Sequence, residues 1–495
     1  MRGLKITKII ISVIIVVITI MFVTALILSD KVGDIILNTV NAKMPTKIEA
    51  QSSRLSFIRK FPHASLEYKN ITVFSTQSFD KKDFKSVNTD TLLHASSVSM
   101  EFSIIDLINK KYDISSVGVK KGKLFIFIDS SGANNYSVAK SEDSPESENN
   151  FILNLDKIML TDVEVVYNDL AISIFMDSWI EKGRLTSKIS RGNILFNAET
   201  NLILSHYTHK NFTLNNPLSV GVDVNLDNSG NGLDIKKGKL FIEGIRFGLT
   251  GSISSEKEMN LKISGEKINL QTIRKYLPPN YAQKLKDYNL KGILTVESAI
   301  TGKISKAENP HFELNYLLEN GSVYRNSTKL NADKIHLKGS FSNGRMNNKN
   351  SSVLTINELK ANVGSGNVNA KLKVNDLNKP FANIELQGRL YPGEIKQYFD
   401  IAKMPYMSGY CDINLNFNSA LPKNDNMLAT NLLKLKPIGT LILNNINIWK
   451  TDNVQILSKV NGEIDFSEYL TTKNFQFEYK NQKATINGKF EKLPE

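Results

Sequence analysis

The sequence is poor in the residues that build cross-links and metal centres. It has a single cysteine, Cys411, which excludes an internal disulfide framework and a cysteine-rich zinc site. Its six histidines and two tryptophans leave little material for a histidine-rich metal centre. The 28 glycines and 13 prolines among 495 residues are too few for a collagen-like or linker-like chain. We therefore expect no cofactor and no metal.

Long blocks of one charge are also missing. The formal net charge is +13, but no run of five or six like charges occurs, so the sequence lacks a typical nucleic-acid-binding arm and we expect no nucleic-acid partner. With 41% hydrophobic and 22% charged residues, the chain is neither disordered nor a polytopic membrane protein. Its length allows about three domains or one elongated, repetitive domain.

One long apolar run lies near the N-terminus, over residues 9–28. Twenty residues of helix would span about 30 Å, the thickness of a bilayer core. Arg2, Lys5 and Lys8 precede the run, which favours a cytoplasmic N-terminus and a single-pass anchor with the bulk of the chain outside. A cleaved signal peptide is the alternative, although its apolar region is normally shorter. The anchor prediction is represented by Ile9, Ile15, Ile20 and Leu28.

Beyond residue 44 the dominant hydrophobic period is two. Apolar and polar residues alternate over 220–226, 312–318, 368–374, 411–417 and 484–490, with Asn, Gly and Ser clusters between such segments. Helical patterns are few and short, the first of them over residues 32–44. The pattern predicts a mainly β fold, with an elongated, repetitive and curved antiparallel sheet, or β-groove, and a few short helices after the N-terminal transmembrane helix.

The chain also repeats itself. The seven residues at 120–126 recur unchanged at 236–242, and a helix, a proline-containing turn and a glycine-led strand recur at 270–300 and 390–417. A period near 120 residues indicates related β units joined end to end. The predicted parts are residues 1–31 (tip and anchor) and the β units 32–150, 151–265, 266–390 and 391–495. The alternation still runs near Glu495, so a continuation of the last unit is left open.

Signatures of catalysis are missing. Gly364-Ser365-Gly366 lacks the spacing of a nucleophile elbow, and His206 and His209 lie in a segment that reads as strand and turn. Cys411 lies on the apolar side of an alternating strand, which favours a buried, inert thiol. A polysaccharide-acting enzyme would need an acid pair, and nothing in the sequence selects one. We therefore predict that the protein is not an enzyme.

Residues 101–136 carry a resemblance to a known family. An amphipathic strand at 101–107 runs into a short helix, a glycine-led strand follows at 122–129, and the segment closes with Gly132-Ala133-Asn134-Asn135-Tyr136. This pattern resembles the N-terminal region of the AsmA family, single-span envelope proteins of Gram-negative bacteria. The resemblance implies an inner-membrane anchor, a periplasmic body, and a role in outer-membrane assembly and phospholipid homeostasis. It also implies kinship with chorein-like bridge proteins that carry lipids in a β-groove.

Strands with one apolar face need a partner for that face. The partner is either another sheet or an apolar molecule that is not protein. The first alternative gives an anchored structural or adhesive β-sandwich array without a ligand. The second gives a groove that binds phospholipid or another acyl-chain lipid and passes it between membranes. Its partners would be the inner membrane and, by the resemblance, outer-membrane assembly components. The candidate groove residues are Val368, Ala370, Leu372, Val374, Ile384, Leu386, Ile413, Leu415 and Phe417.

Overall fold

The computed structural model describes most of the chain. The described residues are 15–16, 19–20, 23, 31–42, 46–60, 63–76, 81–84, 87–109, 114–136, 156–190, 193–210, 212–214, 216–228, 232–273, 283, 285–305, 307–399, 405–421, 437–451 and 454–490. They form two compact units, Met1–Lys257 with Ile304–Ala307, and Glu258–Lys303 with Glu308–Glu495. Both units consist mainly of strands, which confirms the mainly β prediction. The finer division into four β units stays a prediction.

The first unit contains strands β1 to β12. They are β1 Ile48–Glu49, β2 Ser52–Lys60, β3 His63–Phe74, β4 Thr91–Ser103, β5 Ile114–Ile128, β6 Lys157–Asp169, β7 Ile174–Ser190, β8 Asn193–His209, β9 Phe212–Leu214, β10 Leu218–Asn228, β11 Gly232–Ile242 and β12 Ile245–Ser254. Its helices are residues 31–42, η1 Lys81–Asp83 and α2 Ile104–Ile108. The strands pair in chain order, with β1 and β2 along one edge of β3, and β9 and β10 along one edge of β8.

One pairing in this unit departs from the antiparallel expectation. β5 and β6 run parallel, from Ser116 opposite Lys157 to Ile128 opposite Asp169. A parallel pair needs a long connection that returns the chain to the end where the first strand began. Residues 129–156 supply that length. Strand alternation alone cannot reveal the direction of a strand, so this pairing is not predictable from the hydrophobic pattern.

The main core of the first unit lies between the helix of residues 31–42 and strands β2 to β6. Ile36 and Val40 of this helix are buried against Leu66, Tyr68 and other apolar side chains of these strands. The hydroxyl of Tyr68 donates a hydrogen bond to the carbonyl of Gly33 over 2.7 Å, and the phenol is buried. The short helix expected over residues 32–44 thus covers one face of the first strands.

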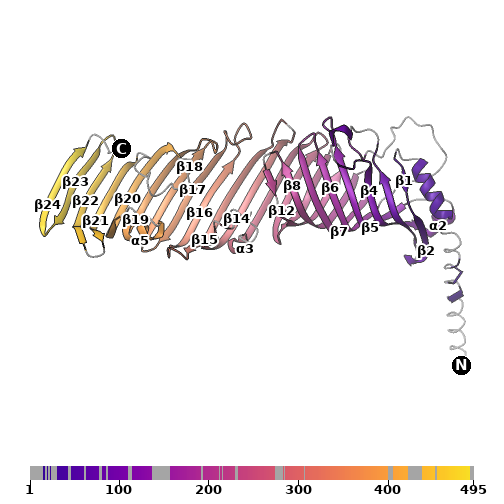
Figure 1. The fold of residues 1–495 in the computed structure, drawn as a ribbon, viewed down its shortest axis with the longest axis horizontal. Coiled ribbons are helices and arrows are strands. Elements are labelled where there is room, and N and C mark those ends of the chain that lie inside the picture. The colour runs from indigo at the N-terminus through magenta and orange to yellow at the C-terminus, as the bar shows by residue number, and fades with distance from the viewer. Residues whose placement is uncertain are drawn as a thin grey trace, which may run out of the picture. The chain divides into compact units, whose positions relative to one another are not determined.

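The second unit contains strands β13 to β24. They are β13 Glu258–Asn269, β14 Tyr288–Lys303, β15 His311–Arg325, β16 Asn331–Ser342, β17 Val353–Val363, β18 Gly366–Asn375, β19 Phe381–Leu390, β20 Tyr406–Ala420, β21 Ile438–Thr451, β22 Val454–Phe466, β23 Leu470–Tyr479 and β24 Gln482–Phe490. Short helices α3 Leu270–Ile273 and α5 Pro392–Phe399 interrupt them. Each strand pairs antiparallel with the next in the chain, and in Figure 1 the strands from β14 to β23 lie side by side in chain order.

The prediction of a membrane anchor is contradicted. No helix in the part of the chain that the structure describes is long and apolar enough to cross a membrane. Ile15 and Ile20 are helical and exposed, while Ile9 and Leu28 lie outside the described residues. The prediction depended on residues 9–28 forming one continuous apolar helix, and the described helical positions in this run are only 15, 16, 19, 20 and 23. The single-pass inner-membrane localisation, with a cytoplasmic N-terminus and a periplasmic bulk, is corrected accordingly.

Candidate functional site

The nine candidate groove residues lie on one face of three neighbouring strands. The cross-strand pairs join Ala370 to Leu386 and Leu386 to Leu415. The next positions join Leu372 to Ile384 and Ile384 to Phe417 in the same way. Because side chains alternate between the two faces of a strand, the remaining three share this face. They are Val368, Val374 and Ile413, the last of which lies opposite Gly388.

This apolar face continues over all twelve strands of the second unit. Following the cross-strand partners of Leu386 in both directions gives a row that never meets a polar residue, and we call it the central row. Its members from β13 to β24 are Ile268, Leu294, Leu318, Leu337, Leu359, Ala370, Leu386, Leu415, Gly439, Phe466, Leu470 and Phe490. At about 4.8 Å between strands, the row is about 50 Å long.

Register shifts keep the central row continuous. In β17 the pairing shifts between Ile356, which faces Leu372, and Leu359, which faces Ala370. These two side chains therefore share a face although they are three residues apart. Leu359 is not among the predicted groove residues because its spacing of three from Ile356 departs from the strand period of two. The same holds for Leu337, because the pairing of β16 with its neighbours shifts next to this residue.

The central row keeps contact with solvent. Apart from Ile268, which is buried, and Phe490, which is exposed, its members are half-buried. The strands of the unit belong to one sheet, and its two short helices contact β13, β14 and β20. A row of leucines inside a closed sandwich would be fully buried, because two sheets pack with their side chains interdigitated. The central row of the described strands thus keeps partial contact with solvent, while Val374, Ile413 and Phe417 on the same face are buried.

The first unit carries a similar row. From β3 to β12, without β9, its members are Leu66, Met100, Val117, Ile158, Leu185, Ala198, Val224, Gly238 and Leu249. The helix of residues 31–42 covers the beginning of this row, where Leu66 is completely buried. Leu185 and Ala198, farther along the row, are half-buried. One end of this apolar face is therefore closed by protein, and the part beyond it is accessible.

The opposite face of the sheet is polar and carries paired charges. The Nζ atom of Lys371 on β18 lies 3.1 Å from Oε2 of Glu385 on β19. The guanidinium of Arg389 donates two hydrogen bonds to the carboxylate of Asp412, over 2.7 and 3.0 Å. In the first unit, the ammonium of Lys239 lies 2.8 Å from the Asp223 carboxylate. In both units, the strands therefore have one polar face with paired charges and one apolar face.

Cys411 and the two histidines His206 and His209 lie on strands β20 and β8. Cys411 is buried in an apolar cluster with Ile413, Ile446 and Val460, and burial raises the pKa of its thiol to about 11. The thiol is therefore protonated at neutral pH and is a poor nucleophile. His206 and His209 both lie on β8, as the sequence predicted. No group of three or more potential metal ligands occurs in the described part of the chain.

The closing part of the segment that carries the family resemblance forms a hydrogen-bonded turn. The side chain of Asn135 is completely buried. It makes hydrogen bonds to the backbone of β5 like those that a neighbouring strand would make. Its amide oxygen accepts a hydrogen bond from the Phe127 amide over 2.8 Å, and its amide nitrogen donates to the carbonyl of Phe125 over 2.9 Å. Asp129 closes the preceding turn by accepting hydrogen bonds from the amides of Ser131 and Ala133. These residues stabilise a turn against β5, and none of them lines the apolar face.

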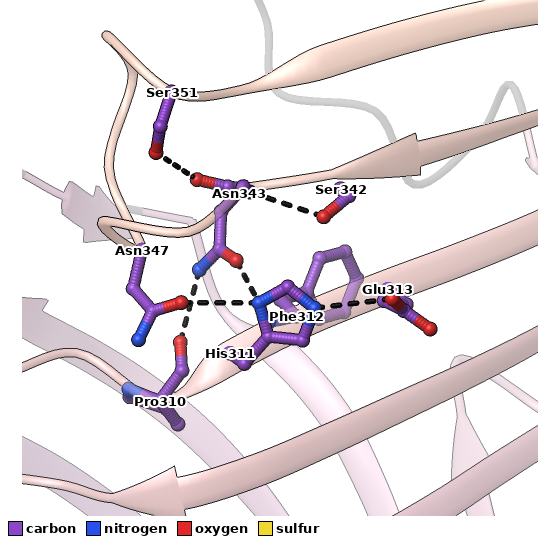
Figure 2. Close-up of polar contacts among 9 residues, drawn as sticks. Pro310, His311, Phe312, Glu313, Ser342, Asn343, Asn347 and Ser351 are labelled. Atoms are coloured by element: carbon purple, nitrogen blue, oxygen red, sulfur yellow. Dashed lines mark hydrogen bonds and ion pairs between the residues drawn. The ribbon is translucent and has the colours of Figure 1, made fainter.

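At one edge of the second unit, the loop of residues 343–352 joins β16 to β17 (Figure 2). The ring of His311, at the start of β15, lies between an oxygen atom of Asn347 in this loop and an oxygen atom of Glu313. The His311 Nε2 atom lies 3.1 Å from Oε1 of Glu313, and its Nδ1 atom lies 3.0 Å from Oδ1 of Asn347. Asn347 is oriented by its own donation to the carbonyl of Asn309 over 3.0 Å. Both ring nitrogens thus face acceptors, which favours the imidazolium, and the Glu313 hydrogen bond is the main cause of a raised His311 pKa.

We expect His311 to titrate above its ordinary pKa of 6.5. The pKa of His311 is raised in the folded state. The contacts of its ring with Glu313 and Asn347 therefore contribute their full stabilisation of the loop at pH values below the ordinary pKa. The contribution is lost as the pH rises through the folded-state pKa. An NMR titration of the His311 ring measures this. Glu313→Gln is expected to lower the pKa, and Asn347→Asp to raise it further. Equal pKa values in the wild type and both variants would contradict the arrangement in Figure 2.

No protein-family model, no curated protein and no solved structure matches this chain. The class of protein is therefore defined by its own geometry. It is a β-sheet protein whose described units each present a continuous, partly open apolar face and a polar face with paired charges.

Proposed function

We propose that this protein binds the acyl chains of lipids along the apolar face of its sheet and passes them along the central row. The observation that carries the proposal is the unbroken apolar row over β13 to β24, whose members are mostly half-buried. An apolar face open to water is unfavourable unless something covers it. An acyl chain is a suitable cover, because burying about fifteen methylenes at about 0.8 kcal/mol each contributes on the order of 12 kcal/mol.

The central row would also let a bound acyl chain move along it. Its positions carry leucine, isoleucine, alanine, phenylalanine and one glycine, Gly439, so an acyl chain that slides by one strand meets no polar side chain in the row. No step requires a polar group to lose its hydrogen bonds, which would be costly. Headgroups would stay in water at the edge of the sheet. The resemblance to the AsmA family, which remains a proposal, would place this activity in phospholipid homeostasis and outer-membrane assembly.

Site-specific photocrosslinking in the full-length protein tests the proposal. A photoreactive amino acid at Leu386, on the apolar face, is expected to crosslink to phospholipid in cells. The matched control at Gln387, the next residue and on the opposite face, is expected to give little crosslinked lipid. Mass spectrometry of the crosslinked protein identifies the adduct. Equal lipid labelling at both positions, or none at either, would leave the ligand-free β scaffold as the better explanation.

A further inference from the structure

Two neighbouring turns form a continuous surface at the edge of the second unit where His311 lies. The loop of residues 343–352 follows β16, and the turn of residues 376–380 joins β18 to β19. The amide of Leu377 donates to the carbonyl of Lys349 over 3.0 Å, and the amide of Asp376 donates to the carbonyl of Ser352 over 2.9 Å. Ser352 is almost completely buried between the turns. The two turns are thus held together as one surface.

Apolar side chains are exposed at this surface. Met346 in the loop is 62% exposed, and Leu377 in the turn and Phe381 at the start of β19 are each 42% exposed. None of the three belongs to the apolar face described above. Phe381 pairs with Asn375 and lies on the polar side, and Met346 and Leu377 lie outside the strands. Three large apolar side chains on two joined turns form an uncovered apolar patch on an otherwise polar edge.

Cationic side chains surround these apolar residues. Arg345, Lys349 and Lys379 are exposed, and no carboxylate among the described residues lies within ion-pair distance of them. The two turns contain a single acidic residue, Asp376, and its carboxylate accepts hydrogen bonds from the amides of Asn378 and Lys379 over 2.9 and 3.0 Å. The surface therefore combines protruding apolar side chains with unneutralised positive charge. We call these residues the rim patch, namely Arg345, Met346, Lys349, Leu377, Lys379 and Phe381.

We propose that the rim patch docks the protein on the surface of an anionic phospholipid bilayer. Apolar side chains at the tips of turns can enter the boundary between headgroups and acyl chains, and flanking lysines and arginines are attracted to anionic headgroups. The patch protrudes as two turns and carries only positive free charge, which complements an anionic lipid surface. This inference goes beyond the proposed function and does not depend on it.

The position of the rim patch relates docking to the apolar face. Val353, Asn375 and Phe381 face one another across β17 to β19 at this edge. One position farther from the edge, Leu354, Val374 and Ala382 form the outermost apolar row of the same strands. A bilayer that contacts the rim patch would thus lie next to the end of the apolar face. If the face binds acyl chains, this edge is where a chain could enter from or leave to the bilayer.

Vesicle flotation of the full-length protein tests the docking, with phosphatidylcholine vesicles that contain or lack phosphatidylglycerol. The apolar variant is Met346→Ser with Leu377→Ser, and the charge variant is Arg345→Gln, Lys349→Gln and Lys379→Gln. We expect each to lower binding to anionic vesicles by more than about tenfold, and the charge variant to abolish the weakening by salt. The wild type should bind vesicles without phosphatidylglycerol less tightly.

Matched controls remove equal numbers of exposed apolar or cationic side chains from the polar face of the same unit. Ile438→Ser with Ile442→Ser removes two exposed isoleucines, and Lys262→Gln, Lys338→Gln and Lys373→Gln removes three exposed lysines. Both controls should bind vesicles like the wild type. Equal losses in patch and control variants would overturn the proposal, as would unchanged binding in the patch variants. A changed oligomeric state with unchanged vesicle binding would assign the patch to a second copy of the chain.

A fluorescent probe gives a measurement that does not depend on an affinity. In a Cys411→Ala background, an environment-sensitive dye on Met346→Cys is expected to shift to the blue when anionic vesicles are added. The same dye on Ile442→Cys should not shift. Lipid crosslinking at Leu386 is scored separately, so a failure of docking and a failure of acyl-chain binding are distinguishable.

Discussion

Replacing Leu386 with aspartate is expected to stop lipid from being held and passed along the central row. Leu386 is half-buried in the row between Ala370 and Leu415. A carboxylate there must stay hydrated, so an acyl chain cannot cover it without a large desolvation penalty. Because the proposed path is serial, one charge in its middle interrupts the whole row. We expect lipid recovered per protein, measured by mass spectrometry of extracted lipid, to fall by at least about tenfold.

Gln387→Glu is the matched control, because it adds the same charge one residue away on the polar face. It should leave the recovered lipid unchanged. Leu386 also packs against the apolar cluster around Cys411, so a loss of folding must be separated from a loss of binding. Circular dichroism measures the folding, and Leu386→Ser provides a milder change that keeps the position uncharged. Wild-type lipid recovery in a folded Leu386→Asp variant would refute the role of the central row.

Replacing Ile36 with alanine is expected to destabilise the first unit strongly. Ile36, on the helix of residues 31–42, is completely buried and belongs to the same apolar cluster as Leu66 and Tyr68. Removing its side chain loses apolar burial and leaves a cavity, which together cost about 2–5 kcal/mol. The neighbouring Ile35→Ala is the matched control, because Ile35 is 47% exposed. Its expected cost is within about 0.5 kcal/mol.

The two tryptophans make the measurement specific to one unit. Trp179 lies on β7 in the first unit and Trp449 on β21 in the second. In a Trp449→Phe background, the fluorescence of Trp179 reports urea unfolding of the first unit alone. The midpoint should fall clearly for Ile36→Ala and hardly at all for Ile35→Ala. Equal midpoints for both variants would show that the helix does not contribute to the core through Ile36.

The sequence predicted the strands well where one face is consistently apolar. The alternating segments at 220–226, 312–318, 368–374, 411–417 and 484–490 all lie within strands, namely β10, β15, β18, β20 and β24. The helices expected in the segments 270–300 and 390–417 are present as α3 and α5. These features follow from neighbours along the chain, since alternation and helical spacing are local properties.

The N-terminal run shows the limit of a local criterion. In the sequence, residues 9–28 are long and apolar enough for a membrane span. Among the residues that the structure describes, no helix is long and apolar enough to cross a membrane. The prediction required one continuous helix over the run, and the described helical positions in it are 15, 16, 19, 20 and 23.

By itself, the sequence determined that this chain forms amphipathic strands, and it selected nine residues of β18 to β20 that share one face. Only the tertiary structure decided how far that face extends, which strands run parallel and which end is covered. The register shift between Ile356 and Leu359 and the parallel pairing of β5 with β6 depend on cross-strand hydrogen bonds between residues distant in sequence. Such bonds set the register that aligns apolar side chains into one row, and the periodicity within a single strand carries no information about them.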